Sequence, residues 1–301
     1  MRSISEWNII EQIGTGSTSS VYLAQNSLTK VIGALKTFEA TAALTASEEM
    51  KIHKSLKHPR ILTYLDSFSC INKVAPSDSS AVLVTELASK GDLFNLIDTV
   101  GCLPEKVART YFNQLLDALS YLHSQSICHL DIKPENVLLD RNFGVKLADF
   151  GISKKLASPD QLLRDRIGTV FYTPPEKLRP ESVYDGFKAD LFALGVTLFT
   201  MMNGGLPFES ASMKDEFYKL IIEGDYAGFW ESHKEVAECP EQYVFSQDFI
   251  ELMNKMLAFD PEERLSLKEL KAHKWTSGAV FNEKQLKSEV TQLFLDSLED
   301  C

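Results

Sequence analysis

The pattern of hydrophobic and polar positions divides the chain into two parts of different character. From Trp7 to Glu86, apolar and polar residues alternate in short runs separated by Gly, Asn and Ser, namely "WNIIEQIG", "SSVYLAQ", "VIGALKTF" and "AVLVTEL". Such runs are typical of β-strands. One helix is expected among them, over "ASEEMKIHKSL", opened by a capping box of Thr45 and Glu48. The first part is therefore predicted to be β-rich.

After Gly91 the periodicity becomes helical. In "PEKVARTYFNQLLDALSYLHSQ", which begins with a proline that suits a first helical turn, the apolar residues on one face are Val107, Tyr111, Leu115, Leu119 and Leu122. A more apolar run extends from Leu191 to Met202. This run is too short to cross a membrane, so it is predicted to be a helix buried on all sides.

These patterns predict one α+β domain with two lobes. The expected boundaries are a small β-rich lobe over residues 7–86, a hinge over 87–91, a larger helical lobe over 92–275 and a C-terminal helical extension over 276–301. Four apolar residues of the extension recur at helical spacing and are expected to pack on the large lobe: Leu286, Val290, Leu293 and Leu298. The sequence has no internal repeat and no low-complexity tract.

Composition and charge narrow the class of protein. The 301 residues are 44% hydrophobic and 24% charged, as in ordinary globular domains. Thirty-one basic and 42 acidic residues give a net charge of −11, which disfavours nucleic acid and membranes as partners. The five cysteines are scattered without a CxxC pair, and the N-terminus lacks the apolar core of a signal peptide. A cytoplasmic location is therefore expected, with access to the nucleus left open.

Two features of the first part could contact a phosphate. Gly14 and Gly16 lie between two expected strands, where a flat hairpin can offer backbone N–H groups, although such a hairpin is more often only a turn. A dinucleotide-binding fold would require a helix after the glycines, and "SSVYLAQ" is instead strand-like. Lys36 lies in the middle of a strand and would be an ordinary exposed lysine if nothing faced it. An ion pair with Glu49 on the following helix would direct its ammonium towards a phosphate.

The second part contains two short polar motifs. "HLDIKPEN" carries Asp131, Lys133 and Asn136, and "KLADFG" carries Asp149. Asp131 could accept the proton of a hydroxyl group, and Lys133 could neutralise charge on a phosphoryl group in transfer. Asn136 and Asp149 offer oxygen ligands that suit Mg²⁺. A chance origin of one such motif is easy, whereas their combination in this order indicates phosphoryl transfer.

In this combination the sequence resembles the eukaryotic protein kinase family over nearly the whole chain. "TPPE" is similar to the family's Ala-Pro-Glu motif, "ADLFALG" is similar to its Asp-x-Trp-x-x-Gly helix, and Arg264 stands where the family's arginine pairs with Glu176. "IKPEN" is the serine/threonine form of the catalytic loop. "HPRIL", "GDLFNLI" and "KAHKW" are most similar to the calcium/calmodulin-kinase-like group. The resemblance implies the bilobal protein-kinase fold and an ATP- and Mg²⁺-dependent transfer of the γ-phosphoryl group to Ser or Thr hydroxyls of protein substrates.

The resemblance also implies the functional residues. The implied nucleotide site comprises Ile13, Gly14, Thr15, Gly16, Ser17, Val21, Ala34, Lys36, Glu86, Ala88, Asp92 and Leu138. The implied catalytic residues are Lys36, Glu49, Asp131 and Lys133, and the implied metal ligands are Asn136 and Asp149. Thr85 stands at the gatekeeper position beside the hinge. His53 stands where the family usually has an aliphatic residue, and it is expected to be a core histidine with satisfied hydrogen bonds.

Leu130 and Asp165 depart from the family pattern together. In the family, an arginine at the place of Leu130 binds a phosphate on the activation segment, which is "ISKKLASPDQLLRDRIGTV" (residues 152–170) in this chain. Asp165 stands where a phosphorylated threonine is frequent. We therefore expect an active kinase that does not require phosphorylation of this segment, in which an arginine restored at position 130 changes activity little. Asp165 could pair with one of four nearby basic residues: Lys154, Lys155, Arg164 and Arg166. Thr169 is expected to contact Asp131 and Lys133 as a structural residue.

Other functions and partners were weighed against this prediction. A pseudokinase scaffold would have lost one of the six catalytic or metal-binding residues, and a small-molecule kinase would not need the docking motifs around "TPPE". Glu135 and Asp92 favour Arg or Lys on the N-terminal side of the target hydroxyl, whereas Thr200 replaces a second glutamate that arginine-directed relatives often carry. The C-terminal "NEKQLKSEVTQLFLDSLED" is acidic, whereas calmodulin targets are basic helices, so no calmodulin partner is expected.

Overall fold

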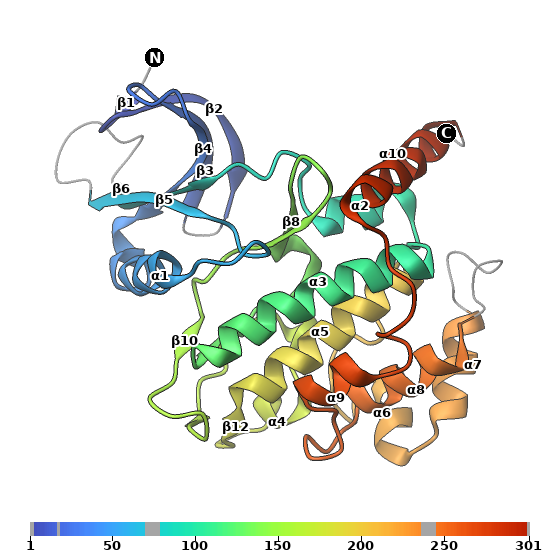
Figure 1. Cartoon of the computed structure of the whole chain (residues 1–301). Coiled ribbons are helices and arrows are strands. Elements are labelled where there is room, and N and C mark those ends of the chain that lie inside the picture. The colour runs from blue at the N-terminus through green and yellow to red at the C-terminus, as the bar shows by residue number, and fades with distance from the viewer. Residues whose placement is uncertain (1–2, 17–18, 70–78, 236–244, 300–301) are drawn as a thin grey trace.

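The protein is described by a computed structural model that covers residues 3–16, 19–69, 79–235 and 245–299. It has a small lobe built on one antiparallel sheet and a large lobe built mainly of helices, with the C-terminal helix beside α2 (Figure 1). The predicted α+β bilobal fold is confirmed. Ser17, which was predicted to contact the nucleotide, lies outside the described residues.

The sheet of the small lobe has six strands in the order β1-β2-β3-β4-β6-β5. Its strands are β1 (Ser3–Ile4), β2 (Trp7–Thr15), β3 (Ser19–Asn26), β4 (Ile32–Glu39), β5 (Tyr64–Ser69) and β6 (Ser79–Glu86). One face packs around a cluster of Trp7, Ala24, Leu35, Val82 and Val84. The four longest runs predicted as strands form β2, β3, β4 and β6. Strand β5 was not predicted, because "YLDSFS" is an edge strand without a fully buried side chain and lacks clear alternation.

Helix α1 (Ala43–Ser55) follows a 3₁₀ turn, η1 (Ala40–Ala42), and packs against β4, β5 and β6. The predicted capping box of Thr45 and Glu48 is wrong, because α1 starts before Thr45 and its N-cap residue, Ala42, has no side-chain cap. Thr45 lies inside the first turn, where its hydroxyl donates to the carbonyl of Ala42 (2.9 Å). The helix is therefore fixed by its packing on the sheet, which places Glu49 above β4.

The large lobe contains nine α-helices and several short strands in the described residues. The helices are α2 (Leu93–Val100), α3 (Glu105–Ser124), α4 (Pro175–Leu178), α5 (Gly186–Asn203), α6 (Glu216–Glu223), α7 (Tyr226–Glu235), α8 (Gln247–Met256), α9 (Leu267–Ala272) and α10 (Glu283–Glu299). The strands are β7 (Ile127–Cys128), β8 (Val137–Leu139), β9 (Val145–Leu147), β10 (Lys154–Lys155), β11 (Leu162–Leu163) and β12 (Tyr184–Asp185). Two further 3₁₀ turns are η2 (Pro134–Asn136) and η3 (Val170–Tyr172).

Helices α3 and α5 form the centre of the large lobe. The five apolar residues predicted for one face of α3 are all fully buried, and every residue of α5 from Leu191 to Met202 is buried, as predicted. Asp185 caps the start of α5 by accepting hydrogen bonds from the backbone of Phe187 and Lys188. Within the residues that the structure describes, no helix is both long enough and apolar enough to span a bilayer.

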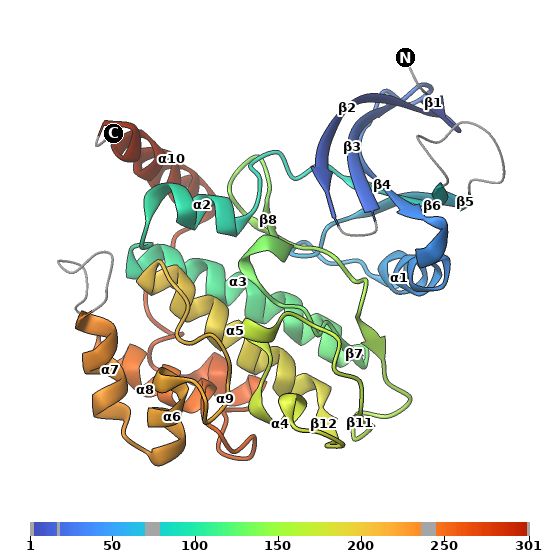
Figure 2. The ribbon, with the colours of Figure 1, turned by 180° about the vertical axis from the view of Figure 1, so that it is seen from behind.

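Helix α10 packs against α2 and α3, and both views show it next to α2 (Figures 1 and 2). Leu286 and Val290 are 1% and 0% exposed, and Leu293 is partly buried against the same core. Their predicted packing is confirmed. The prediction is wrong for Leu298, which is 71% exposed, because α10 extends past the surface that covers its first turns.

Candidate active site

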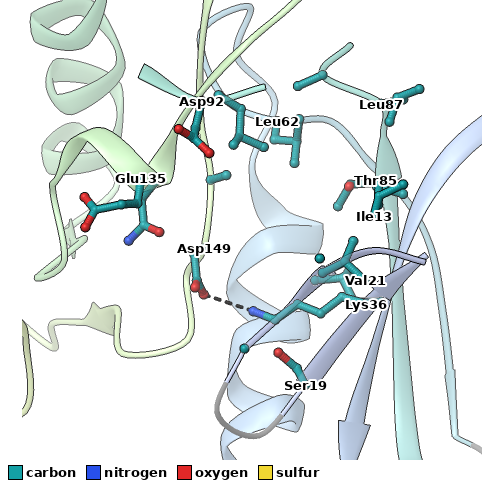
Figure 3. A pocket seen from close by; sticks show the side chains of 18 of the residues that line it. Ile13, Ser19, Val21, Lys36, Leu62, Thr85, Leu87, Asp92, Glu135 and Asp149 are labelled. Atoms are coloured by element: carbon teal, nitrogen blue, oxygen red, sulfur yellow. Dashed lines mark hydrogen bonds and ion pairs between the residues drawn. The ribbon is translucent and has the colours of Figure 1, made fainter. Parts of the chain in front are cut away.

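A cavity of about 440 Å³ lies between the sheet and the large lobe. It brings together all the described residues of the predicted nucleotide site, together with Glu49, Asn136 and Asp149. Figure 3 shows Val21, Lys36 and Asp149 among them. Asp131 and Lys133 are not among its lining residues. Leu87 and Gly91 of the predicted hinge also line it, as do three apolar or small residues that the sequence did not single out: Leu62, Leu83 and Ala148. Leu83 could have been found from Thr85, since residues two apart in a strand share a face.

Lys36 lies at the centre of this cavity. From β4, its ammonium contacts Glu49 Oε1 on α1 at 2.8 Å. It also contacts Asp149 Oδ1 at 3.0 Å, the interaction drawn as a dashed line in Figure 3. Burial alone would lower the pKa of Lys36, but the carboxylates of Glu49 and Asp149 outweigh this effect and raise the pKa. The predicted ion pair is therefore present, and it holds a permanent cation in the cavity.

The loop that carries Asp131 is fixed by one buried carboxylate. Asp190 of α5 accepts hydrogen bonds from the backbone N–H groups of His129 (2.9 Å) and Leu130 (2.7 Å), and from His123 Nε2 (3.0 Å). Leu130 has a φ of 69°, a backbone conformation that costs free energy in a residue other than glycine. The two backbone hydrogen bonds to Asp190 hold this conformation and so direct the Asp131 side chain.

The Asp131 carboxylate is surrounded by donors. Oδ1 accepts from the Thr169 hydroxyl (2.9 Å), while Oδ2 accepts from Asn136 Nδ2 (2.8 Å) and lies 3.0 Å from Lys133 Nζ. Lys133 also donates to Thr169 Oγ1 (2.8 Å), so Thr169 makes the contacts predicted for it. The donors orient Asp131 and connect the catalytic loop to the activation segment.

Asn136 and Asp149 form a donor set that fits Mg²⁺. The amide nitrogen of Asn136 donates to both the backbone oxygen and Oδ2 of Asp131, which leaves the amide oxygen for a cation. Burial would raise the pKa of Asp149, but Lys36 and the Gly151 N–H group lower it, so the carboxylate stays ionised. No group of three or more His, Cys, Asp or Glu in the described residues could hold a metal. A pair of oxygen ligands suits a magnesium ion that also binds substrate phosphates.

The predicted hinge residue Glu86 is held by bonds to two residues, Thr63 and Lys146. Its backbone N–H donates to the carbonyl of Thr63 (2.9 Å), and its carboxylate lies 2.7 Å from Lys146 Nζ. Burial would raise the pKa of Glu86, but the hydrogen bonds from Lys146 and Thr63 lower it. Glu86 and Ala88 both line the cavity.

Asp92, the predicted ribose contact, lines the cavity but also caps a helix. It accepts from the backbone N–H of Asn95 at 2.7 Å and from Asn95 Nδ2 at 2.8 Å, and it begins α2 in this way. Its position at the cavity mouth thus follows from the start of α2.

His53 is only partly satisfied, contrary to the expectation for a core histidine. Its Nε2 donates to the carbonyl of Leu62 (2.6 Å), whereas its buried Nδ1 has no partner among the described residues. The His53 ring lies 4.9 Å from the ring of Phe150, which lies 5.1 Å from the ring of His129. Burial lowers the pKa of His53, so the ring is neutral at neutral pH.

The activation segment is attached to the large lobe by two short strand pairs. Strand β10 pairs with β7, and β11 pairs with β12, which lies beside α4 (Figure 2). Leu130 is 8% exposed and belongs to an apolar cluster with Cys128, Leu156, Leu163, Tyr184 and Ala189. Asp165 accepts a hydrogen bond from the Tyr184 hydroxyl (3.2 Å), and no ion pair joins it to the basic residues expected to face it in this described segment.

A buried ion pair fixes helix α4, which follows the activation segment. Arg264 Nη1 and Nη2 donate to the two carboxylate oxygens of Glu176 at 2.7 and 2.8 Å, in the pairing expected from the sequence. Arg264 Nε also donates to the carbonyl of Ala258 (2.8 Å). Both charges are hydrogen-bonded, as buried charges need to be.

Comparison with known proteins agrees with this geometry. The family described as "Protein kinase domain" matches residues 7–276. The chain is 35% identical over 280 residues to CBL-interacting protein kinase 11 of Oryza sativa subsp. japonica, covering 90% of the chain and 51% of that protein. It is 32% identical over 286 residues to CBL-interacting serine/threonine-protein kinase 16 of Arabidopsis thaliana, with 90% and 56% covered.

A third relative is serine/threonine-protein kinase kin-29 of Caenorhabditis elegans, which is 30% identical over 280 residues, with 91% of the chain and 31% of that protein covered. The chain thus spans about half of the length of the two plant relatives and less than half of the length of the nematode relative. The family predicted from the sequence is confirmed. The chain belongs to the protein kinase domain family.

Proposed function

We propose that the protein is an ATP-dependent serine/threonine protein kinase that transfers the γ-phosphoryl group of ATP to Ser or Thr hydroxyls of protein substrates. The observation that carries this proposal is the joint placement of two charged groups of residues. Lys36 contacts Glu49 and Asp149 in the cavity, and Asp131 is held by Lys133 and Asn136 nearby. The names of the relatives, which are serine/threonine kinases, support the same activity.

In this proposal the chain binds and orients both reactants. The adenine lies between Val21, Ala34 and Leu138, and the backbone of Glu86 and Ala88 meets its polar edge. Ile13 to Gly16 cover the phosphates, and Lys36 pairs with them. Asn136 and Asp149 would hold Mg²⁺, which would supply charge neutralisation at the phosphates.

The chemical step assigns different work to Asp131 and Lys133. Asp131 accepts the proton of the substrate hydroxyl as its oxygen attacks the γ-phosphorus, and the bond from phosphorus to the bridging oxygen of ADP breaks. Lys133 stabilises the negative charge on the phosphoryl group during transfer. The hydrogen bonds from Thr169 and Asn136 to Asp131 orient its carboxylate towards that hydroxyl.

The alternative is a pseudokinase that acts as a scaffold. Its sequence hallmark would be the loss of a residue needed for transfer, and all six are present: Lys36, Glu49, Asp131, Lys133, Asn136 and Asp149. The short distances from Lys36 to Glu49 and Asp149 and from Lys133 to Asp131 also support kinase activity. Kinase activity is therefore the better-supported function.

Incubation of the purified protein with labelled ATP, Mg²⁺ and a basic protein substrate tests the activity. We expect label transfer to serine or threonine, and we expect Asp131→Asn to reduce turnover by roughly 10²–10⁴-fold, since it removes the proton acceptor. Asp98→Asn, an exposed change on α2, is the matched control. Nucleotide binding without any transfer by the unaltered protein would favour the scaffold.

We also propose that activity does not require phosphorylation of the activation segment. Leu130 cannot bind a phosphate, and Asp165 stands where a phosphorylated residue would otherwise supply the charge. Initial rates before and after phosphatase treatment should therefore agree closely, with mass spectrometry showing an unmodified segment. A collapse of the rate traced to Ser158 or another hydroxyl of the segment would contradict this proposal.

The proposed substrates carry Arg or Lys on the N-terminal side of the target residue. Glu135 is exposed beside the cavity and Asp92 lies at its mouth, so both can face such a cation. Thr200 is buried in α5, where its hydroxyl donates to the carbonyl of Val196, and it adds no charge for this purpose.

A further inference from the structure

A buried cation lies beneath the activation segment. Lys177 of α4 is 3% exposed. Its Nζ would lie 3.3 Å from a Cβ placed on Gly168, and the carbonyl oxygen of Leu130 would lie 3.5 Å from the same Cβ. Gly168 has a φ of 148°. The ammonium group of Lys177 therefore lies next to Gly168. Burying this charge costs free energy unless other polar groups offset the loss of hydration.

The compensation comes from Tyr184 and from the segment itself. The Lys177 ammonium lies 5.2 Å from the centre of the Tyr184 ring, within the range of a cation–π interaction. The Tyr184 hydroxyl donates to Asp165 Oδ1 at 3.2 Å. Burial lowers the pKa of Lys177, and the carboxylates of Asp165 and Asp190 oppose that effect. Tyr184 thus lies between an anion of the segment and a cation of α4.

The backbone supports this arrangement. Strand β11 pairs with β12 so that Leu163 faces Tyr184, two residues before Asp165. Leu163 and Tyr184 also share the apolar cluster of Leu130. Position 130, where the family has an arginine, is therefore apolar. The cation near the segment is instead Lys177, which belongs to α4.

We propose that Asp165, Tyr184 and Lys177 form a permanent positioning cluster, which holds the activation segment in the arrangement that protein substrates require. This inference rests on the proposed kinase function. The Asp165 carboxylate supplies a fixed negative charge on the segment and accepts a hydrogen bond from Tyr184. Lys177 supplies a positive charge over the ring of the same tyrosine. Because neither charge depends on a modification, the segment is held at all times.

The cluster acts on the active site through Gly168. The Lys177 ammonium lies next to Gly168, and the next residue, Thr169, hydrogen-bonds both Asp131 and Lys133. Loss of the cluster should therefore disturb the surface that binds a protein substrate more than the cavity that binds the nucleotide. A purely structural role would instead lower thermal stability and would not raise KM for the protein substrate more than KM for ATP.

Three substitutions test the cluster: Asp165→Asn, Tyr184→Phe and Lys177→Met. The controls are Asp160→Asn and Lys155→Met, which change exposed residues of the same segment. Each cluster variant should raise KM for the protein substrate roughly three- to tenfold, with KM for ATP unchanged. Hydrogen exchange over residues 163–169 should become faster in these variants and stay unchanged in the controls. Tyr184→Phe removes one hydroxyl only, so it keeps the test valid if Lys177→Met fails to fold.

The double variant Asp165→Asn with Lys177→Met adds a test of coupling. If the two residues act through Tyr184, its KM should rise less than the product of the two single effects. Multiplicative effects, or exchange no faster than in the controls, would overturn the positioning cluster. If the unaltered protein transfers no phosphoryl group, the proposed function fails, while the exchange measurement still decides whether the cluster holds the segment.

Discussion

At the scale of single residues, His53 makes stability depend on pH. Its buried ring packs on Phe150, and its Nδ1 has no partner in the described part of the chain. Burial lowers its pKa below 6.5, and the charges that face it are Lys36, which lowers the pKa further, and Asp149, which opposes this. His129, beyond Phe150, also lowers it. A protonated His53 is therefore disfavoured in the folded protein.

The sign of the pH effect follows from this lowered pKa. An unfolded chain takes up a proton at His53 as the pH falls below about 6.5, while the folded chain resists it, so stability falls towards acid pH. We expect the melting temperature to fall less between pH 7.5 and pH 5.5 in His53→Leu than in the unaltered protein. His233 is also buried with a lowered pKa. It is present in both proteins, so its contribution to the pH dependence cancels in the comparison. Equal losses in the two proteins would contradict this assignment.

At the scale of elements, the activation segment depends on the apolar cluster around Leu130. The sequence suggested that Leu130→Arg would change activity little, but Leu130 is 8% exposed among Leu156, Leu163 and Tyr184. A guanidinium there would be buried in this apolar cluster near the Lys177 ammonium, and the Asp165 carboxylate beside the cluster is already hydrogen-bonded to Tyr184. We therefore expect Leu130→Arg to lower the free energy of unfolding by about 2–4 kcal/mol.

Leu130→Met is the control, because a change of similar volume costs less than about 1.5 kcal/mol. Chemical denaturation of both variants measures the difference. An arginine variant as stable as the methionine variant would show that the cluster opens to admit the charge, and the structural account of the segment would need revision.

At the scale of the whole molecule, α10 is part of the large lobe. Its apolar residues Leu286 and Val290 are buried against α2 and α3, so the face that a helix-binding partner would need is already covered. We expect that calcium-loaded calmodulin leaves the initial rate unchanged. Deletion of residues 283–301 should lower the melting temperature and should not raise the rate. A several-fold rise in either experiment would show that α10 restrains the enzyme.

The sequence by itself determined much of this protein. Period-2 and period-3.6 patterns located the strands, the buried faces of α3 and α5 and the packing of α10, because burial repeats with the geometry of each element. Motif order identified the family and the residues at the cavity. The sequence did not reveal the start of α1, edge strand β5 or the exposure of Leu298, since these depend on neighbours far along the chain.

Only the tertiary structure decided which groups meet. Lys36 and Asp149 are 113 positions apart yet their side chains lie 3.0 Å from each other. Asp165 bonds Tyr184 rather than the basic residues beside it in sequence, and Lys177 is buried although lysine is usually exposed. Such contacts arise from the pairing of β11 with β12 and the docking of α4, and no local pattern encodes them. Local periodicity therefore determined the elements, motif order determined the residues of the candidate site, and the packing between elements determined how the activation segment is held.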